Sequence, residues 1–295
     1  MGNPAHRSVG HERDSPQVMV QTSERVSVGP YLLTKPLGAN GAAEGHLALH
    51  QADQSNHVAY RFAAVYDKAG IRRFVNAARL CQEIRHDHLL PIEYHTLDAQ
   101  GHPWVVCPYT GDVDGLRTLR KLLREKSGQL HPFEAERAIV QILDASRHAH
   151  KQSLVHGPMT LDDVLVDRHG SLLVQFYGFS RMVEQGESEA NLAELIRDEV
   201  RSIVEIGYQL ITGLRAEEPL IPAGRLVKKL DPRWDAWILH GLEAMAGFDT
   251  AAQALAALPC HLDIADDEDV FAPGVMGGVM GGVRGVISRL RTGRS

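Results

Sequence analysis

Short apolar runs separated by turn-like sequences dominate the first third of the chain. Three of these runs, at 28–37, 45–50 and 57–65, are divided by GANGAAE and QADQSN, in which Gly, Asn, Asp and Ser favour turns. Two more runs, at 89–97 and 103–109, enclose the turn-like sequence DAQGH. This pattern predicts a small antiparallel sheet whose last two strands form a hairpin.

A helical pattern interrupts these strands once and becomes dominant after residue 110. Over residues 68–85 the apolar positions recur at helical spacing: Phe74, Ala77, Ala78, Cys81 and Ile84. Further elements are predicted as a β-hairpin at 154–177 and as helices at 132–150, 189–213, 233–246 and 250–258. The chain is therefore predicted to be α+β, with a strand-rich first part and a helical second part.

Composition adds limits to this picture. The 295 residues are 44% hydrophobic and 23% charged, which is enough to bury a substantial core. A net charge of −6 gives no electrostatic reason to expect nucleic-acid binding. Three scattered cysteines, Cys81, Cys107 and Cys260, are interpreted as reduced thiols. With no signal-peptide pattern and no apolar run approaching 18 residues, we expect a cytoplasmic protein.

The two ends of the sequence differ from the middle. Residues 1–27 are polar and aperiodic and are expected to form a disordered arm. In the segment 259–295, an acidic run at 263–269 precedes a sequence at 274–295 that is rich in Gly, Val and Arg. This last segment is interpreted as a flexible tail, because dense glycine opposes a helix. The alternative is an amphipathic segment that contacts a membrane or a partner.

Five stretches in order resemble signature sequences of the protein kinase family, in its bacterial serine/threonine form. Residues 37–48 are similar to the Gly-rich loop, 58–62 to the lysine-bearing strand, and 73–92 to the helix of the small lobe. Residues 148–167 are similar to the catalytic loop, and 199–213 to the central helix of the large lobe. The resemblance covers residues 28–258. It implies a bilobal fold, with a small β-sheet lobe at 28–107 and a helical lobe at 108–258.

Family members transfer a phosphoryl group with a short set of charged side chains, and this sequence lacks them. The resemblance places other residues at those positions: Arg61 for the lysine, Ala77 for its glutamate partner, Pro158 for the base aspartate, Thr160 for the next lysine, and Phe176 for the main metal-binding aspartate. Proline offers no side-chain acceptor, and a phenyl ring cannot coordinate Mg²⁺. The resemblance therefore implies that no catalytic residue is in place.

Four positions are candidates for binding a nucleotide or Mg²⁺. Gly38 and Gly41 remain from the Gly-rich loop, and Arg61 keeps a positive charge, so these three are the candidate nucleotide contacts. Asp163 stands where the family has its metal-ligand asparagine, and it is the candidate Mg²⁺ ligand. An exposed or capping role for Asp163 is the favoured interpretation.

Positions that serve packing in the family are better preserved than those that serve chemistry. Cys81, His156 and Tyr177 match an apolar column that crosses both lobes, and Ala59 and Leu165 match a second column. Because the packing positions persist while the charged positions are lost, the sequence resembles a pseudokinase.

Two further positions and one deletion complete the resemblance. Gly178 matches the third residue of the metal-binding triplet, and Glu199 replaces the aspartate that supports the catalytic loop. Only 20 residues separate them, too few for a full activation segment, so the platform for a peptide substrate is expected to be missing.

The leading hypothesis is a catalytically inactive kinase-like domain that binds a protein partner, such as an active kinase or another signalling component, without a cofactor. The alternative is an unusual serine/threonine kinase or ATP-binding protein. It would bind ATP and Mg²⁺ with recruited residues: Arg61, Asp162, Asp163 or Glu83. A histidine metal enzyme is disfavoured, because no Cys or Glu completes a ligand set around the spaced histidine pairs.

Overall fold

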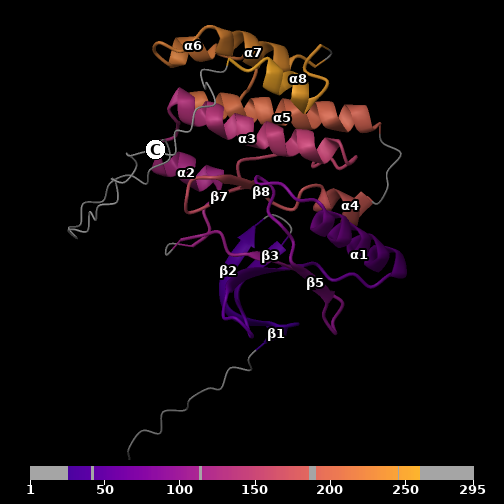
Figure 1. The fold of residues 1–295 in the computed structure, drawn as a ribbon. Helices are drawn as coiled ribbons and strands as arrows, with labels where there is room; N and C mark the ends of the chain where they lie inside the picture. Colours follow the sequence, from indigo (N-terminus) through magenta and orange to yellow (C-terminus); the bar gives the residue numbers. More distant parts are fainter. Residues whose placement is uncertain (1–25, 41–42, 113–114, 186–190, 245, 260–295) are drawn as a thin grey trace, which may run out of the picture.

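A six-stranded antiparallel sheet forms the N-terminal lobe (Figure 1). The computed structural model describes residues 26–40, 43–112, 115–185, 191–244 and 246–259, so most of the expected arm and tail lies outside the described residues. The strands run in the order β1-β2-β3-β4-β6-β5. Their bounds are β1 (Ser27–Val28), β2 (Tyr31–Asn40), β3 (Ala43–His50), β4 (Asn56–Phe62), β5 (Tyr94–Leu97) and β6 (Pro103–Pro108). The predicted antiparallel sheet and its final hairpin are confirmed.

One helix, α1 (Lys68–Glu83), packs on this sheet. Asp67 caps it by accepting a hydrogen bond from the Gly70 amide at 2.7 Å, which satisfies one of the free amides of the first turn. The predicted apolar face is buried, including Phe74 and Cys81. The helix therefore joins its lobe through the same residues that revealed it in the sequence.

The C-terminal lobe is helical apart from one short hairpin. Its elements are α2 (Leu119–Glu125), α3 (Pro132–His150), β7 (Val164–Val166), β8 (Leu172–Val174), α4 (Phe179–Gln185), α5 (Leu192–Thr212), α6 (Ala223–Leu226), α7 (Arg233–Leu242) and α8 (Ala251–Ala256). Sequence periodicity predicted the short helix α8 but missed α2, α4 and α6, each of which has seven residues or fewer. None of the described helices has both the length and the apolar character needed to cross a membrane.

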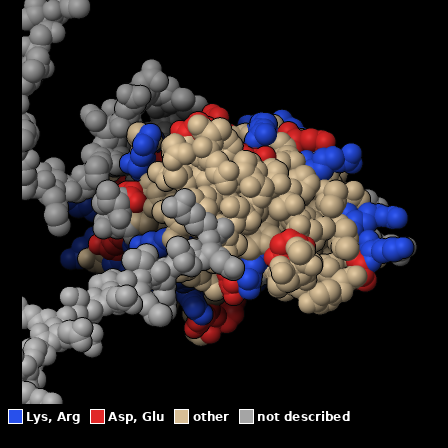
Figure 2. Space-filling model, turned by 90° about the horizontal axis from the view of Figure 1, so that it is seen from below, with Lys and Arg blue, Asp and Glu red and all other residues tan. Residues whose placement is uncertain are grey.

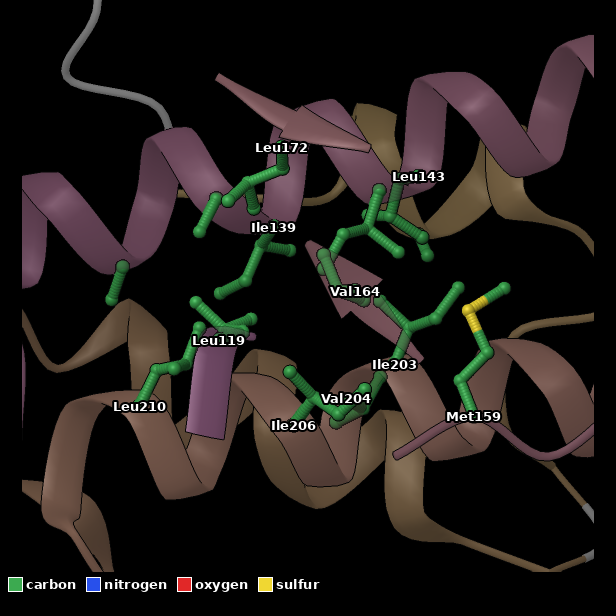
Figure 3. Close-up of a cluster of buried hydrophobic side chains, with 14 of the residues drawn as sticks. Leu119, Ile139, Leu143, Met159, Val164, Leu172, Ile203, Val204, Ile206 and Leu210 are labelled. Atoms are coloured by element: carbon green, nitrogen blue, oxygen red, sulfur yellow. The ribbon is translucent and has the colours of Figure 1, made fainter. Parts of the chain in front are cut away.

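The core of this lobe lies between α3 and α5 (Figure 3). Ile139 of α3 faces Ile203 and Leu210 of α5, and Leu172 of β8 closes one side. All four side chains are at most 1% exposed. The β7–β8 hairpin is thus packed against the buried core of this lobe.

A second apolar cluster joins the two lobes. It contains Val58 and Tyr60 of β4, Phe74 of α1, Leu165 of β7 and Phe179 of α4. Seen from the side of the N-terminal lobe, the middle of the described surface is largely uncharged, and Lys and Arg lie toward its margin (Figure 2). The predicted α+β, two-lobed architecture is confirmed, and apolar side chains lie between the two lobes.

Candidate functional site

The side chains of β4 alternate between the inter-lobe cleft and the opposite face of the sheet. Val58 and Tyr60 belong to the apolar cluster that includes Leu165 of the C-terminal lobe. Ala59 instead packs with Trp104 in a separate cluster on the other face. The expected column of Ala59 with Leu165 is therefore wrong by one residue, and Val58 takes that place.

The position expected for Arg61 is also wrong by one residue along β4. Its side chain is 39% exposed, and its Nη2 atom lies 3.3 Å from Oε2 of Glu44, the residue paired with it on β3. The two side chains therefore share the face that looks away from the cleft. Because side chains alternate with a period of two, a one-residue error in alignment moves an expected side chain to the wrong face. The residue of β4 that points into the cleft is Tyr60, so the placement of Arg61 at the lysine position is corrected.

Aromatic rings occupy the part of the cleft where members of the protein kinase family carry charged groups. The ring centroids of Tyr60 and Phe176 are 4.7 Å apart with an interplanar angle of 89°, an edge-to-face contact. Phe62 lies 5.7 Å from the same Phe176 ring. Tyr60 is 2% exposed, its hydroxyl donates to Oε1 of Gln175 at 3.4 Å, and burial raises the pKa of the phenol. Ala77, opposite on α1, is 1% exposed and carries no charge.

Phe176 adopts a backbone conformation that is unusual for its type. Its φ is +45°, in the left-handed region where bulky residues are rare. The turn is closed by a hydrogen bond from the Phe179 amide to the Phe176 carbonyl at 2.8 Å. Such a conformation costs on the order of 1–3 kcal/mol and persists only where surrounding contacts fix it. The contacts with Tyr60 and Phe62 supply that support.

Glu199 holds the loop that precedes Pro158. Its carboxylate is fully buried and accepts hydrogen bonds from the amides of His156 at 2.6 Å and Gly157 at 3.2 Å. It also lies 2.9 Å from Nε2 of His150 and accepts a bond from the Tyr177 hydroxyl. Burial works to raise the pKa of Glu199, but the hydrogen bond and charge of His150 and the Tyr177 hydroxyl outweigh it, and the pKa lies below its ordinary value. The glutamate thus remains an anion that anchors the loop.

The column expected at Cys81, Tyr177 and His156 is assembled across the two lobes. The Cys81 thiol donates to the Tyr177 carbonyl at 3.4 Å, and the rings of Tyr177 and His156 lie 5.6 Å apart. Gly178 follows with a φ of +70°, and a Cβ there would approach the Val155 carbonyl to 2.8 Å. Glycine is therefore required where the chain turns away from the column.

Asp163 is already engaged within its own loop. Its Oδ2 atom accepts hydrogen bonds from the amide of Thr160 at 2.7 Å and from the Thr160 hydroxyl at 2.8 Å. Asp163 lines a cavity of about 240 Å³ together with Pro158 and Phe176. Across the described ranges no group of three or more His, Cys, Asp or Glu side chains is arranged to hold a metal ion. Asp163 is the one carboxylate among the described residues that line this cavity, which also includes the polar side chains of His156, Gln175 and Ser180.

The Gly-rich loop is only partly described. Gly38 adopts a φ of +91° at the end of a bulged stretch of β2, and space is open around it. Gly41 lies outside the described residues. The two expected nucleotide contacts on this loop therefore remain predictions.

Helix α4 is a part of the site that the sequence did not reveal. It begins at Phe179, whose ring is 1% exposed and lies 5.0 Å from Phe62 and 5.9 Å from Phe74. Nε of Arg73 on α1 donates to the carbonyl of Val183 in α4 at 2.9 Å. The available signal was the apolar residue directly after Gly178, in a stretch too short to show a helical period. This helix closes the side of the cleft next to α1.

The two described cysteines should be chemically inert in the folded protein. Burial raises the pKa of the Cys81 thiol to about 12, and it raises the pKa of Cys107, which is 0% exposed, well above the ordinary value. Because the thiolate is the reactive form, neither residue should be alkylated by iodoacetamide at about pH 8 in the native protein, whereas both should react in denaturant. Peptide mass spectrometry measures this, and rapid native modification of Cys81 would contradict the packed column.

Comparisons with known proteins agree with the two-lobed architecture. The sequence pattern of the family described as protein tyrosine and serine/threonine kinase matches residues 38–197, more than half of the 295 residues. The chain is 29% identical over 160 residues to serine/threonine-protein kinase PrkC of Bacillus subtilis, a match covering 53% of this chain and 24% of that protein. It is 28% identical over 181 residues to CBL-interacting protein kinase 25 of Oryza sativa subsp. japonica, covering 58% and 32%.

A solved structure supports the fold alone. The crystal structure of the Mycobacterium tuberculosis PknI kinase domain superimposes with a TM-score of 0.63 at 16% identity, covering 79% of this chain and 96% of that domain. The matched regions span no more than about a third of the curated relatives, so these relatives have long parts with no counterpart in the match.

Proposed function

We propose that this chain, which belongs to the protein tyrosine and serine/threonine kinase family, is catalytically inactive and acts by binding a protein partner. The observation that carries the proposal is the edge-to-face contact of Tyr60 with Phe176 in the middle of the cleft. Two aromatic rings occupy positions where phosphoryl transfer requires a cation and a metal ligand.

The energetics of the cleft support this proposal. Val58, Tyr60, Cys107 and Leu165 are each at most 2% exposed, so they offer almost no surface to a nucleotide. Its phosphates would meet rings in place of charged groups. Moving a polyanion from water to such a surface is unfavourable without compensating charge or hydrogen bonds.

Residues that an unusual kinase could recruit are engaged elsewhere. Arg61 pairs with Glu44 on the far face of the sheet. Asp162 lies 2.5 Å from Nε of Arg120. Glu83 is exposed at the end of α1, 4.0 Å from Arg79. These positions do not converge on the cavity beside Phe176, which favours binding over phosphoryl transfer as the function.

A thermal-shift titration with ATP and Mg²⁺ tests the proposal. Saturating a site to 100 times its Kd would stabilise the protein by about 2.7 kcal/mol and raise the melting temperature clearly. We expect no shift at millimolar nucleotide, with or without Mg²⁺, while an ATP-binding kinase measured in parallel shows one. A Mg²⁺-dependent shift, followed by transfer of the γ-phosphate to the protein or to a generic substrate, would overturn the proposal.

The partner is proposed to be a protein, such as an active kinase or another signalling component. Exposed apolar side chains on and beside α1 support this: Tyr66 is 82% exposed, Val75 40% and Leu80 38%. Exposed aromatic and aliphatic groups of this kind are typical anchors of protein interfaces.

A further inference from the structure

A cavity of about 620 Å³ lies in the C-terminal lobe, apart from the inter-lobe cleft. It opens where the α2–α3 connection, the end of α5 and the segment between α6 and α7 meet. Its wall includes the apolar side chains of Leu130, Phe133, Val227, Leu230 and Trp234, and also two carboxylates, Glu136 and Asp231, of which Asp231 is paired with Arg233. Phe133 is 43% exposed, so part of this wall faces solvent.

Two adjacent lysines give this cavity a positive rim. Lys228 and Lys229 are exposed, and within the described part of the chain their ammonium groups form no ion pair. The third lysine of the cavity, Lys126, is held 2.9 Å from Glu134. Lys229 has a φ of +62°, an uncommon conformation for a residue other than glycine. A ligand that fits here combines carboxylates with apolar side chains.

The chain itself supplies such a sequence immediately after its last described residues. The stretch 263–271 reads DIADDEDVF and contains five acidic residues, flanked by Ile264, Val270 and Phe271. Its charge is opposite to that of the lysine rim, and its apolar residues match the wall. Free carboxylates against exposed ammonium groups provide both attraction and orientation.

Helix α8, which precedes this stretch in the sequence, contacts a tryptophan that packs beside the cavity. The carbonyl of Ala254 in α8 accepts a hydrogen bond from Nε1 of Trp237 at 2.9 Å. The ring of Trp237 lies 5.8 Å from that of Trp234, which lines the cavity. The last described residue is Pro259, and positions 263 and 271 lie four and twelve residues beyond it, lengths that span up to about 13 Å and about 40 Å when extended. The stretch therefore has the length needed to reach a cavity of its own chain.

We propose that residues 263–271 bind in this cavity in cis, with the acidic run against Lys228 and Lys229 and the apolar residues against Phe133 and Trp234. A short tether gives an effective concentration on the order of millimolar, so even a weak contact is populated. In this arrangement the segment covers a surface that is otherwise open to an acidic partner. This contact does not depend on whether a nucleotide binds in the cleft.

Zero-length carbodiimide cross-linking of the full chain tests this contact directly. The reagent joins a lysine ammonium to a carboxylate only where the two touch. We expect links from Lys228 or Lys229 to acidic residues of 263–269, with Lys126 and Glu134 as the internal positive control. A Lys126–Glu134 link without any link to 263–269 would overturn the proposal.

Mixing heavy-isotope-labelled and unlabelled chains separates contact in cis from contact between two copies. Links confined to one isotopic form support the proposal, whereas links between labelled and unlabelled chains would show a second copy in the cavity and overturn it. A further variant carries Asp266→Asn, Asp267→Asn, Glu268→Gln and Asp269→Asn. Backbone hydrogen exchange at 227–231 should become several-fold faster in this variant and in wild type at high salt. Unchanged exchange in both would also count against the contact.

Discussion

Replacing Glu199 with alanine is expected to lower the free energy of unfolding by about 3–5 kcal/mol, the range for removing one partner from a buried charged pair. The substitution leaves the amides of His156 and Gly157 without their acceptor, and it removes the hydrogen bonds that join Glu199 to His150 and Tyr177. All of these groups surround a carboxylate that is 0% exposed, so water cannot replace it without opening the lobe. Urea unfolding followed by circular dichroism measures the loss.

Glu205→Ala is the matched control for this experiment. Glu205 lies on the same helix, but its side chain is 46% exposed and pairs with Arg201 at 3.5 Å. Surface pairs contribute about 0–1 kcal/mol, so the control should unfold almost like wild type. Equal losses in the two variants would mean that Glu199 does not anchor the loop.

The pH dependence of the Glu199 effect has a defined sign. The folded-state pKa of Glu199 is lowered, so its contribution to stability is present above the unfolded-state pKa and is lost as the pH falls through the folded-state pKa. The difference in stability between wild type and Glu199→Ala should therefore be largest near neutral pH and should shrink in acid. A difference that grows as the pH falls would contradict the assignment of an anchoring anion.

Replacing Tyr60 with alanine is expected to cost about 3–5 kcal/mol, as for other large-to-small changes of buried aromatic residues. The variant loses the edge-to-face contact with Phe176 and leaves a cavity between the lobes. It also removes a contact that holds Phe176 in its left-handed conformation. Denaturant unfolding gives the magnitude.

Tyr66→Ala is the control for Tyr60→Ala. Tyr66 is 82% exposed, so the same chemical change at that position should alter stability by no more than about 0.5 kcal/mol. If Tyr60→Ala proved as mild as Tyr66→Ala, the cleft would not be filled in the way that the inter-lobe cluster indicates.

The cleft and the proposed binding surfaces lie in different parts of the domain. Part of the cleft between the lobes is occupied by side chains of the chain itself, such as Tyr60 and Phe176. The binding surfaces proposed above lie elsewhere, on α1 and beside Lys228 and Lys229.

The sequence alone determined the order of the elements and much of the inter-lobe column. Helical spacing located α1, and the predicted bounds of α3 agree with the structure, because long amphipathic helices repeat their apolar positions several times. The spacing of signature sequences also identified Cys81, His156, Tyr177 and Glu199, which the structure brings together. These residues lie in segments whose local pattern is distinctive.

Only the tertiary structure decided which face of β4 enters the cleft. VAYRF contains side chains for both faces, and the period of two does not say which set packs against α1 and the C-terminal lobe. Burial of Tyr60 against Phe176 settles the choice and turns Arg61 outward. The cavity beside Trp234 likewise combines residues about a hundred positions apart, such as Lys126 and Lys228. Local sequence specifies elements, whereas the surfaces that bind or exclude a ligand arise from packing between elements that are distant in the chain.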